Sequence, residues 1–530
     1  MRSRFCGFLL GLGTAVARSR FCGFLLGLGA AAVFSLHGGT VVENVEIFAD
    51  RTMNGARFGV GMLLEREFLN RGEAEAEVEL VASDYHARSV RTLKLAPGER
   101  RLARVFMPKC LQNCDLRSLV VNGREIEKSE LLKLDGNGAG TQAALFSPDA
   151  AAELDDTRGF PLRNWSLDPR AYCSYDRIFI SENEFFSVSP ELRRTLIDAA
   201  LFGTPLTVGF SSDESVRFGR LMVSPAAAER IRRDFPLVAE LESKNESPIY
   251  RVPKSAVDVG ECQPFLSWLV FGGLAAFALA VCPGAFILFR RGNRLKIYLL
   301  APCISVAAVA VLGLLAVSGG GMSGRAAVSG IINLSEKEAL ALVAANVSYY
   351  CPMPPKAGLR FTAGTLAVPN GAEYYSYIED NAGTITIADW IKPRQKANID
   401  LKSLVEFDGG LNVLAADGDM LKVKNQLGVP LKRLVYRWGD DLFYGVGIAA
   451  DGVAELRRSD YPRLDFAACV GRVSLSGQYA AELDVPWLIP VGSDEIGVVS
   501  AEVVLIGTDD APPPEPVGTA ETISGTEVRL

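Results

Sequence analysis

Two long apolar runs constrain this chain more than any other feature of its sequence. Residues 265–289 and 297–317 contain no charged side chain, and about 20 such residues cross the apolar core of a bilayer as a helix. The turn between them contains no acid and four basic residues: Arg290, Arg291, Arg294 and Lys296. Because basic loops are retained on the cytoplasmic side, we expect a transmembrane hairpin with both flanking parts outside the cytoplasm.

The N-terminal segment is internally duplicated. Residues 2–13 recur unchanged at 18–29. One copy provides a basic start, an apolar stretch and small residues, which is the pattern of a secretory signal. We expect residues 1–37 to be a signal peptide, with an uncleaved N-terminal anchor as the alternative.

The stretches on either side of the apolar runs contain strand patterns. Residues 40–107 and most of the chain after 319 alternate apolar and polar side chains between turns rich in Asn and Gly. This alternation favours antiparallel β-sandwiches. The two stretches echo each other weakly, since Asn70 begins a turn after a strand in the first and Asn425 does so in the second.

The pattern changes from about residue 130, where short apolar strands begin to alternate with helices. Ser189 and Pro190 form a helix start, because Ser caps the first backbone N–H groups and Pro suits the first turn. Gly203 ends this helix, and Ser224 and Pro225 begin another. The order strand–helix–strand–helix predicts a parallel α/β layer.

Some of these segments resemble a known group of proteins. The segments are residues 175–181, the helix from Leu192 to Gly203, the strand 206–209, and the prolines at Pro283 and Pro302. They resemble uncharacterised two-span bacterial envelope proteins. The resemblance implies an N-terminal β-sandwich, an α/β domain similar to class I glutamine amidotransferases but lacking their catalytic residues, and a C-terminal extracytoplasmic β domain.

We therefore expect a multidomain membrane protein: a β-sandwich plus a flavodoxin- or amidotransferase-like α/β ectodomain, a two-helix transmembrane hairpin and a C-terminal β-sandwich. The expected boundaries are 1–37 for the signal peptide or anchor, 38–127 for the β-sandwich, 128–262 for the α/β domain, 263–290 for the first transmembrane helix, 291–296 for the cytoplasmic turn, 297–318 for the second helix, 319–508 for the β-rich domain and 509–530 for a disordered tail.

Charge and histidine content limit the function. The net charge is -7, without a basic stripe, so we expect no nucleic-acid partner. Histidine occurs only at His37 and His86, which argues against His-based metal sites and against Ser-His-Asp or Cys-His catalysis. We expect no catalytic residue, no metal and no cofactor. Four tryptophans suggest either a sugar-binding platform or ordinary core positions: Trp165, Trp390, Trp438 and Trp487.

The cysteines outside the apolar runs suggest disulfides, since an extracytoplasmic compartment is oxidising. Cys351 and Cys469 are the two cysteines after residue 319, and Cys110 and Cys114 form a local Cys-x-x-x-Cys pair. Both pairs are possible disulfides, with buried free thiols as the alternative.

The sequence predicts a non-enzymatic envelope membrane protein that acts as a binding or scaffold module on the extracytoplasmic face. Its expected partners are the lipid bilayer and other envelope or membrane proteins, and its expected location is the bacterial cytoplasmic (inner) membrane. Two alternatives remain open: a carboxylate-dependent hydrolase of envelope polymers, and an accessory subunit of a membrane transporter complex.

Overall fold

The computed structural model covers the whole chain. The part of the chain described below comprises residues 45–50, 61–108, 114–120, 130–132, 144–154, 159–209, 215–218, 220–240, the single positions 272, 286, 290 and 306, and residues 324–371, 374–380, 382–459, 466–470, 472–473 and 476–508.

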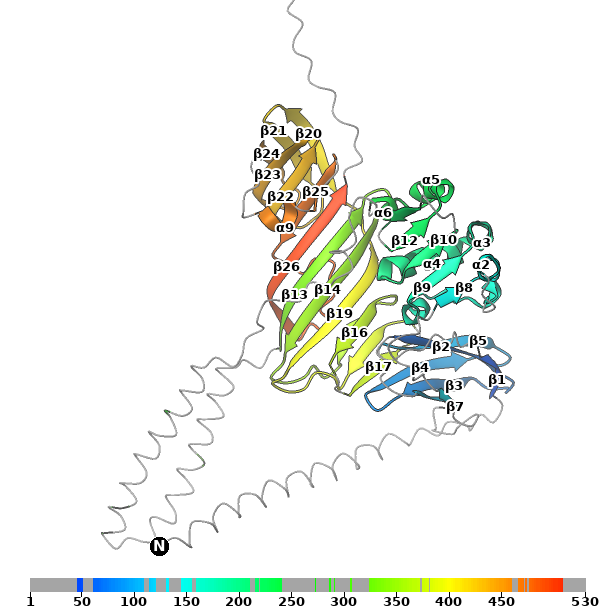
Figure 1. Ribbon diagram of the computed structural model, residues 1–530. Coiled ribbons are helices and arrows are strands. Elements are labelled where there is room, and N and C mark those ends of the chain that lie inside the picture. The colour runs from blue at the N-terminus through cyan, green and yellow to red at the C-terminus, as the bar shows by residue number, and fades with distance from the viewer. Residues whose placement is uncertain are drawn as a thin grey trace, which may run out of the picture.

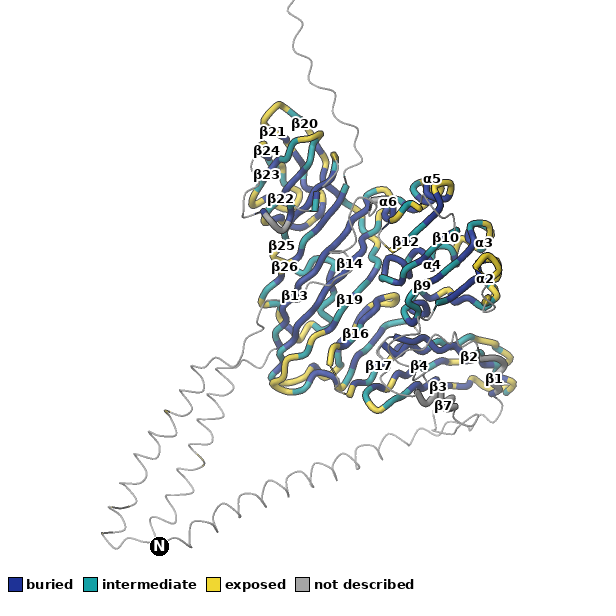
Figure 2. Tube along the Cα trace, viewed as in Figure 1, coloured by how far each residue is buried: buried dark blue, intermediate teal, exposed yellow. Residues whose placement is uncertain are grey.

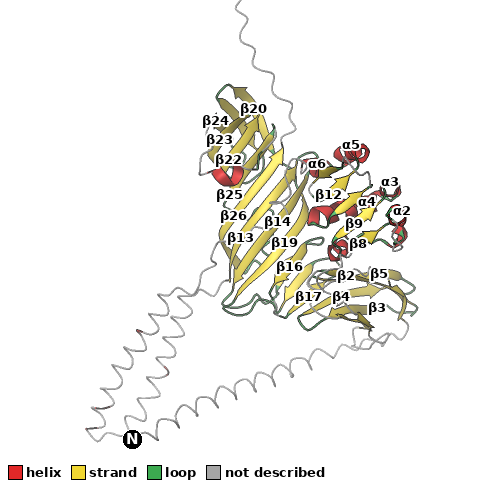
Figure 3. Cartoon of the chain, viewed as in Figure 1, coloured by secondary structure: helices red, strands yellow, loops and turns green. Residues whose placement is uncertain are grey.

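Strands dominate the described part of the chain, where helices are few and short (Figure 3). The longest helix among the described residues has 13 residues, and no described helix is long and apolar enough to cross a membrane. The predicted fold class, a membrane protein with a two-helix transmembrane hairpin, is therefore wrong for the part of the chain that the structure describes. Hydropathy identifies segments with suitable length and composition, but it does not establish a helix. The runs 265–289 and 297–317 themselves lie outside the described residues, apart from Gly272, Phe286 and Val306.

The N-terminal lobe, defined here as strands β1 to β7, consists of two facing layers. The first layer is a three-stranded antiparallel sheet in the order β1-β2-β5. The second contains β4, β3, β6 and β7, again antiparallel. The strands are β1 (Val45–Asp50), β2 (Met62–Asn70), β3 (Ala76–Ser83), β4 (Ala87–Leu95), β5 (Arg100–Met107), β6 (Cys114–Val120) and β7 (Glu130–Leu132).

Strands from the far end of the sequence extend the second layer. Strand β17 pairs in parallel with β4, so that Glu379 lies opposite Arg91. The sheet has seven strands, in the order β15-β18-β17-β4-β3-β6-β7. Segments more than 250 residues apart in sequence are thus joined by backbone hydrogen bonds (Figure 1). The added strands are β15 (Leu359–Phe361), β17 (Tyr375–Glu379) and β18 (Ile385–Ala388).

The α/β region, defined as residues 144–240, lies beside the N-terminal lobe (Figure 1). Four of its strands, β8, β9, β10 and β12, are parallel, and β11 is antiparallel at the edge. The strands are β8 (Ala144–Phe146), β9 (Arg177–Ile180), β10 (Leu206–Val208), β11 (Val216–Phe218) and β12 (Leu221–Val223). The helices are α2 (Pro148–Glu153), η1 (Leu162–Asn164), η2 (Pro169–Ser174), α3 (Glu182–Ser187), α4 (Pro190–Phe202), α5 (Pro225–Asp234) and α6 (Pro236–Glu240).

Local sequence signals set the limits of the longer helices. The Ser189 hydroxyl accepts the backbone N–H of Leu192 at 3.2 Å, and Pro190 occupies the first turn of α4. Gly203 ends α4 in the left-handed conformation, with φ of 112°, which glycine adopts without a steric penalty. The hydroxyl of Ser224 caps α5 in the same way as Ser189 caps α4. These starts and the stop of α4 are confirmed as the sequence predicts them.

The predicted separate C-terminal β-sandwich is also corrected: eleven strands after residue 319 form one continuous sheet, and β15, β17 and β18 join the seven-stranded sheet of the N-terminal lobe. The order of the eleven-stranded sheet is β16-β19-β14-β13-β26-β25-β22-β23-β24-β21-β20. The strands are β13 (Gly324–Ser335), β14 (Leu340–Tyr350), β16 (Leu366–Asn370), β19 (Lys396–Glu406), β20 (Leu411–Asp417), β21 (Met420–Asn425), β22 (Leu431–Trp438), β23 (Asp441–Ile448), β24 (Val453–Arg458), β25 (Gln478–Leu483) and β26 (Ile496–Thr508), with helix α9 (Ala467–Val470) before β25.

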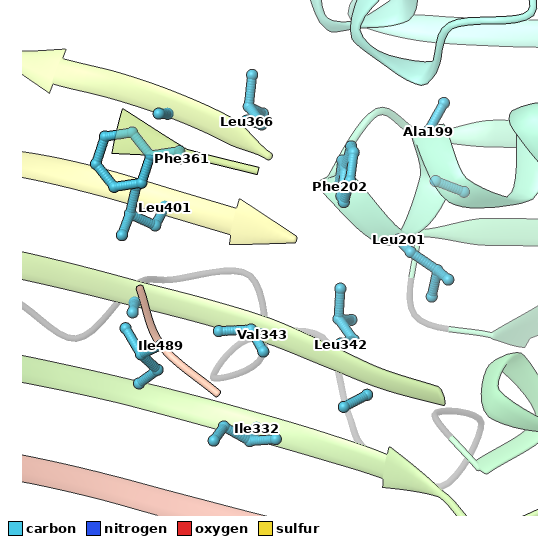
Figure 4. Close-up of a cluster of buried hydrophobic side chains, with 14 of the residues drawn as sticks. Ala199, Leu201, Phe202, Ile332, Leu342, Val343, Phe361, Leu366, Leu401 and Ile489 are labelled. Carbon is cyan, nitrogen blue, oxygen red and sulfur yellow. The ribbon is translucent and has the colours of Figure 1, made fainter. Parts of the chain in front are cut away.

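The centre of this sheet is covered on both faces. Nearly every residue of β13 and β14 is buried (Figure 2), in contrast to the alternation of a half-exposed strand. On one face, Leu201 and Phe202 at the end of α4 share an apolar cluster with Leu342 of β14 and Leu401 of β19 (Figure 4). The α/β region is therefore packed against the long strands as part of one core.

The C-terminal lobe, defined as strands β20 to β26, repeats the strand pairing of the N-terminal lobe. In the N-terminal lobe, β1 pairs with β2, β2 with β5, β3 with β4, β3 with β6, and β6 with β7. In the C-terminal lobe, β20 pairs with β21, β21 with β24, β22 with β23, β22 with β25, and β25 with β26. All ten pairings are antiparallel, and the first pair of each lobe contains a bulge.

Two asparagines occupy equivalent places in this repeat. Asn70 ends β2, and its side-chain Nδ2 donates to the carbonyl of Leu95 at 3.0 Å. Asn425 ends β21, and its Nδ2 donates to the carbonyl of Ala449 at 2.9 Å. Each Oδ1 also accepts a backbone N–H two residues further on. The weak echo that the sequence shows at these positions is a matched structural device that ties two turns together in each lobe.

Candidate functional site

The carboxyl ends of the parallel strands meet at one edge of the α/β sheet, which is where open α/β sheets bind ligands. Three serines lie there: Ser147 after β8, Ser181 after β9 and Ser224 after β12. Each begins a helix, and each hydroxyl accepts a backbone N–H three residues on. These hydroxyls therefore serve as helix caps.

Two glutamates of α3 fill this edge. Glu184 is buried, and it accepts hydrogen bonds from the hydroxyl of Ser181, at 3.0 Å, and from the hydroxyl of Ser147. Glu182 accepts a hydrogen bond from the hydroxyl of Ser224 at 2.6 Å. Anions are stabilised at helix N-termini. The chain's own carboxylates therefore occupy the places that an anionic ligand would take.

Cys173 lies away from this edge. It belongs to η2, which precedes β9, and not to a turn that follows a strand. Burial raises the pKa of its thiol to about 11, so the group is protonated at neutral pH. Because the thiolate is the nucleophilic form, Cys173 lacks both the position and the ionisation of a catalytic cysteine.

A cleft of about 480 Å³ opens between the N-terminal lobe and the α/β region. Strands β2 and β5 form one wall, and η1 with the start of α4 forms the other. The volume falls within the range of small-ligand sites, roughly 300–1,000 Å³. The lining combines aliphatic, charged and hydroxyl side chains: Glu65, Leu102, Arg104, Leu162, Arg163, Trp165, Ser166, Leu167, Val188, Ser189 and Leu192.

A carboxylate–guanidinium pair lies in this cleft. Glu65 and Arg104 are directly opposite each other on β2 and β5, and Arg104 Nε donates to Glu65 Oε1 at 2.7 Å. The hydroxyl of Ser166 donates to the same oxygen at 2.7 Å. Glu65 is only 4% exposed. Two partners from two parts of the chain thus hold the carboxylate in one orientation.

The pair retains unused hydrogen-bonding capacity. Both hydrogen bonds to Glu65 end on Oε1, and no described residue donates to Oε2. Arg104 uses Nε, and its two Nη groups donate to no other described residue. The cleft therefore offers a carboxylate acceptor beside two guanidinium donors, and the hydrogen bond between the two side chains orients both.

A second charged cluster is largely buried and joins three parts of the chain. Arg170 of η2 lies 2.7 Å from Asp168 and 3.2 Å from Glu379 of β17, and Arg91 of β4 lies 2.7 Å from Glu379. Burial opposes the charged form of Asp168, but the Arg170 guanidinium outweighs it and lowers the pKa of that carboxyl. Because each charge has a partner, this cluster connects strands and does not present a reactive group.

The predicted disulfide between Cys351 and Cys469 is wrong. Both cysteines are free and buried, and they lie in two different apolar clusters. Burial raises the pKa of each thiol to about 11. Two cysteines after residue 319 are enough for one disulfide by number, but disulfide geometry requires Cα atoms within about 7 Å. Cys110 lies outside the described residues, and Cys114 begins β6.

The other predicted site residues are distributed as follows. Arg290 is exposed and stacks over Phe286 at 5.4 Å, whereas Arg291, Arg294 and Lys296 lie outside the described residues. Trp165 and Trp390 are 5% and 3% exposed, which removes their rings from a sugar-binding platform; Trp438 and Trp487 are partly buried. No cluster of three or more potential metal ligands occurs in the part of the chain that the structure describes.

Sequence reasoning missed Glu65 and Arg104. The local pattern does not single them out, because β2 also contains Arg66 and Glu67, and β5 also contains Arg100 and Arg101. Which charged residues face a cleft depends on how the α/β region is placed, and the sequence pattern does not reveal that placement.

Comparisons with known proteins give no family. No family model matches the chain, and no curated protein matches it. A yeast delta-COP-I mu-homology domain in complex with a Dsl1 WxWxV peptide is 8% identical, with 35% of this chain and 96% of that chain covered and a TM-score of 0.18. An Amycolatopsis orientalis exo-chitosanase is 11% identical, with 32% of this chain and 23% of that chain covered and a TM-score of 0.14.

A third solved structure covers more of the chain. A β-glucuronidase from glycoside hydrolase family 2 is 10% identical, with 88% of this chain and 62% of that chain covered and a TM-score of 0.15. This chain thus spans less than two thirds of the length of each of these two glycoside hydrolases. All three TM-scores are too low to carry an argument about fold or function. The resemblance to two-span bacterial envelope proteins stays a prediction.

Proposed function

We propose that this protein is a non-enzymatic binding module whose partner occupies the cleft between the N-terminal lobe and the α/β region. One observation carries the proposal: Glu65 and Arg104 are fixed in the cleft, with one carboxylate oxygen and two guanidinium nitrogens unused by the described residues. Polar groups that are held in place within a concave site and keep hydrogen-bonding capacity favour a bound ligand.

The composition of the cleft favours binding over hydrolysis. Glycoside hydrolases generally use two carboxyl groups about 5–10 Å apart, and the cleft lining contains one, Glu65. Nucleophilic catalysis needs a base beside a serine or cysteine. Ser166 instead donates to the carboxylate oxygen that Arg104 neutralises, and no histidine follows His86 in the sequence.

The partner class that we propose is another protein of the bacterial envelope. The location at the cytoplasmic membrane, with the large domains on its outer side, stays a prediction. Cell fractionation with protease protection tests it without reference to the cleft.

The binding role is tested by blocking the cleft. Leu167 lines it and is 45% exposed, whereas Leu154 is 44% exposed and lies outside its lining. Leu167→Arg and Leu154→Arg therefore make a matched pair of variants. We expect affinity capture of the full chain from native cells to retain a defined set of partners with Leu154→Arg and to lose a partner with Leu167→Arg. Identical partner sets for both variants and for the unaltered chain would contradict the proposal.

A further inference from the structure

The cleft lining narrows the chemistry of the ligand. Glu65 Oε2 is an acceptor, and the Nη groups of Arg104 are donors beside it, because Arg104 Nε already holds the other oxygen of Glu65. A ligand that satisfies both must present a donor and an acceptor next to each other. A peptide backbone does this, with its N–H and its C=O groups.

Part of the cleft lining, called the leucine–valine wall below, is aliphatic. Five of its eleven lining residues are leucine or valine: Leu102, Leu162, Leu167, Val188 and Leu192. Leu167 is 45% exposed, so it has apolar surface available for a ligand. Burying a leucine-sized side chain against such a wall is favourable by about 25 cal/mol per Å².

The tryptophan in the cleft lining is not placed to bind a sugar. Saccharides stack on accessible ring faces, but Trp165 is 5% exposed, and its Nε1 donates to the carbonyl of Phe160 at 3.0 Å. Charge also selects against cationic ligands, because Arg104 balances Glu65 and Arg163 adds a further positive charge to the lining.

We infer that the cleft binds a peptide segment with an apolar side chain, its backbone N–H donating to Glu65 and a backbone C=O accepting from Arg104. This inference rests on the proposed function and specifies its ligand. Main-chain hydrogen bonds would supply orientation, and the leucine–valine wall would select the side chain, as in other modes of peptide recognition.

The test uses methyl NMR of the full chain with labelled leucine. The probes are acetyl-Ala-Leu-Ala-amide, the same peptide with an ester oxygen in place of the leucine N–H, acetyl-Ala-Gly-Ala-amide, and the neutral disaccharide N,N′-diacetylchitobiose (called chitobiose below). We expect a saturable shift of the Leu167 and Leu192 methyls with the leucine peptide, and about tenfold weaker binding of the ester, because hydrogen bonds to charged groups are the strong ones. Binding of the glycine peptide is expected to be at least tenfold weaker.

Two variants accompany these ligands. Leu167→Ala should weaken binding of the leucine peptide about fivefold, and Leu154→Ala should leave it unchanged. Equal affinity for the amide and the ester would overturn the assigned role of Glu65. Saturation by chitobiose without saturation by the peptide would overturn the peptide inference and leave the binding role of the cleft intact. Absence of any shift at Leu167 or Leu192 with the leucine peptide would also overturn the inference. The binding role of the cleft is tested separately, by the affinity-capture experiment with Leu167→Arg.

Discussion

Glu379→Gln is predicted to weaken the connection of strand β17 to the N-terminal lobe and to the α/β region. The carboxylate of Glu379 is 2.7 Å from Arg91 of β4 and 3.2 Å from Arg170 of η2. The side chains of these three residues are 9%, 14% and 5% exposed, respectively. The substitution keeps the shape of the side chain and removes the charge that lies between a buried guanidinium group, that of Arg170, and a largely buried one, that of Arg91.

The expected loss follows from burial. Removing one partner of a buried ion pair costs about 3–5 kcal/mol, because the remaining charge loses its compensation. Arg170 keeps Asp168 at 2.7 Å, and the glutamine carbonyl can still accept one hydrogen bond. We therefore expect the free energy of unfolding to fall by about 2–3 kcal/mol. Burial lowers the pKa of the Arg91 guanidinium, and the Glu379 carboxylate raises it. The positive charge of Arg91 therefore loses the most stabilisation when Glu379 becomes neutral.

The assay is urea unfolding followed by tryptophan fluorescence, with a matched control. Glu455 faces Lys422 across two strands at 3.9 Å, and both side chains are about half exposed or more. Glu455→Gln should change the free energy of unfolding by less than about 0.5 kcal/mol. Adding Arg91→Met to Glu379→Gln should recover part of the loss. A loss below about 1 kcal/mol for Glu379→Gln, or no recovery in the double variant, would refute the reasoning.

Three further predictions concern single groups. Burial raises the pKa of the Asp198 carboxyl from 3.8 to about 6, so between these values the folded state keeps a proton that the unfolded state has lost. The free energy of unfolding should therefore fall as pH rises from about 4 to 6. Asp198→Asn should flatten this part of the stability–pH curve and raise the free energy of unfolding by about 1–2 kcal/mol at pH 7.5. Asn70→Ala and Asn425→Ala should each lower the free energy of unfolding by about 2–3 kcal/mol, because each leaves buried carbonyls without a donor. Thermal or chemical unfolding measures this, and a large loss for one variant with none for the other would contradict the equivalence of the two asparagines. Cys351 and Cys469, with thiol pKa values near 11, should resist iodoacetamide at pH 8 until denaturant is added, and mass mapping of a linked pair would show the free-thiol assignment to be wrong.

Local signals predicted local structure well. Ser189, Pro190 and Gly203 define α4 through capping and backbone conformation, which depend on neighbouring residues alone. The parallel order of β8, β9, β10 and β12 likewise follows from alternating strands and helices. The predicted fold class was wrong because it depended on the apolar runs and on treating the C-terminal strands as a separate sandwich.

Long-range pairing was beyond the reach of the sequence pattern. The parallel pairing of β17 with β4 joins residues 375–379 to residues 87–91, and no local signal records a partner so distant. Burial of β13 and β14 on both faces also depends on the placement of other elements against them. The same limit applies to the site, since Glu65 becomes part of a cleft only when Ser166 and the start of α4 are placed opposite β2.

The most direct test of the account is site-specific photocrosslinking in native cells. A photoreactive amino acid replaces Arg163, which lines the cleft, or Leu154, which does not. Both residues are exposed, so either substitution leaves the core intact. If the cleft holds the partner, illumination will yield a discrete adduct from position 163 that Leu167→Arg abolishes, and none from position 154. Equal adducts from both positions, or an adduct from 163 that persists with Leu167→Arg, would contradict the central claim that this cleft is the binding site.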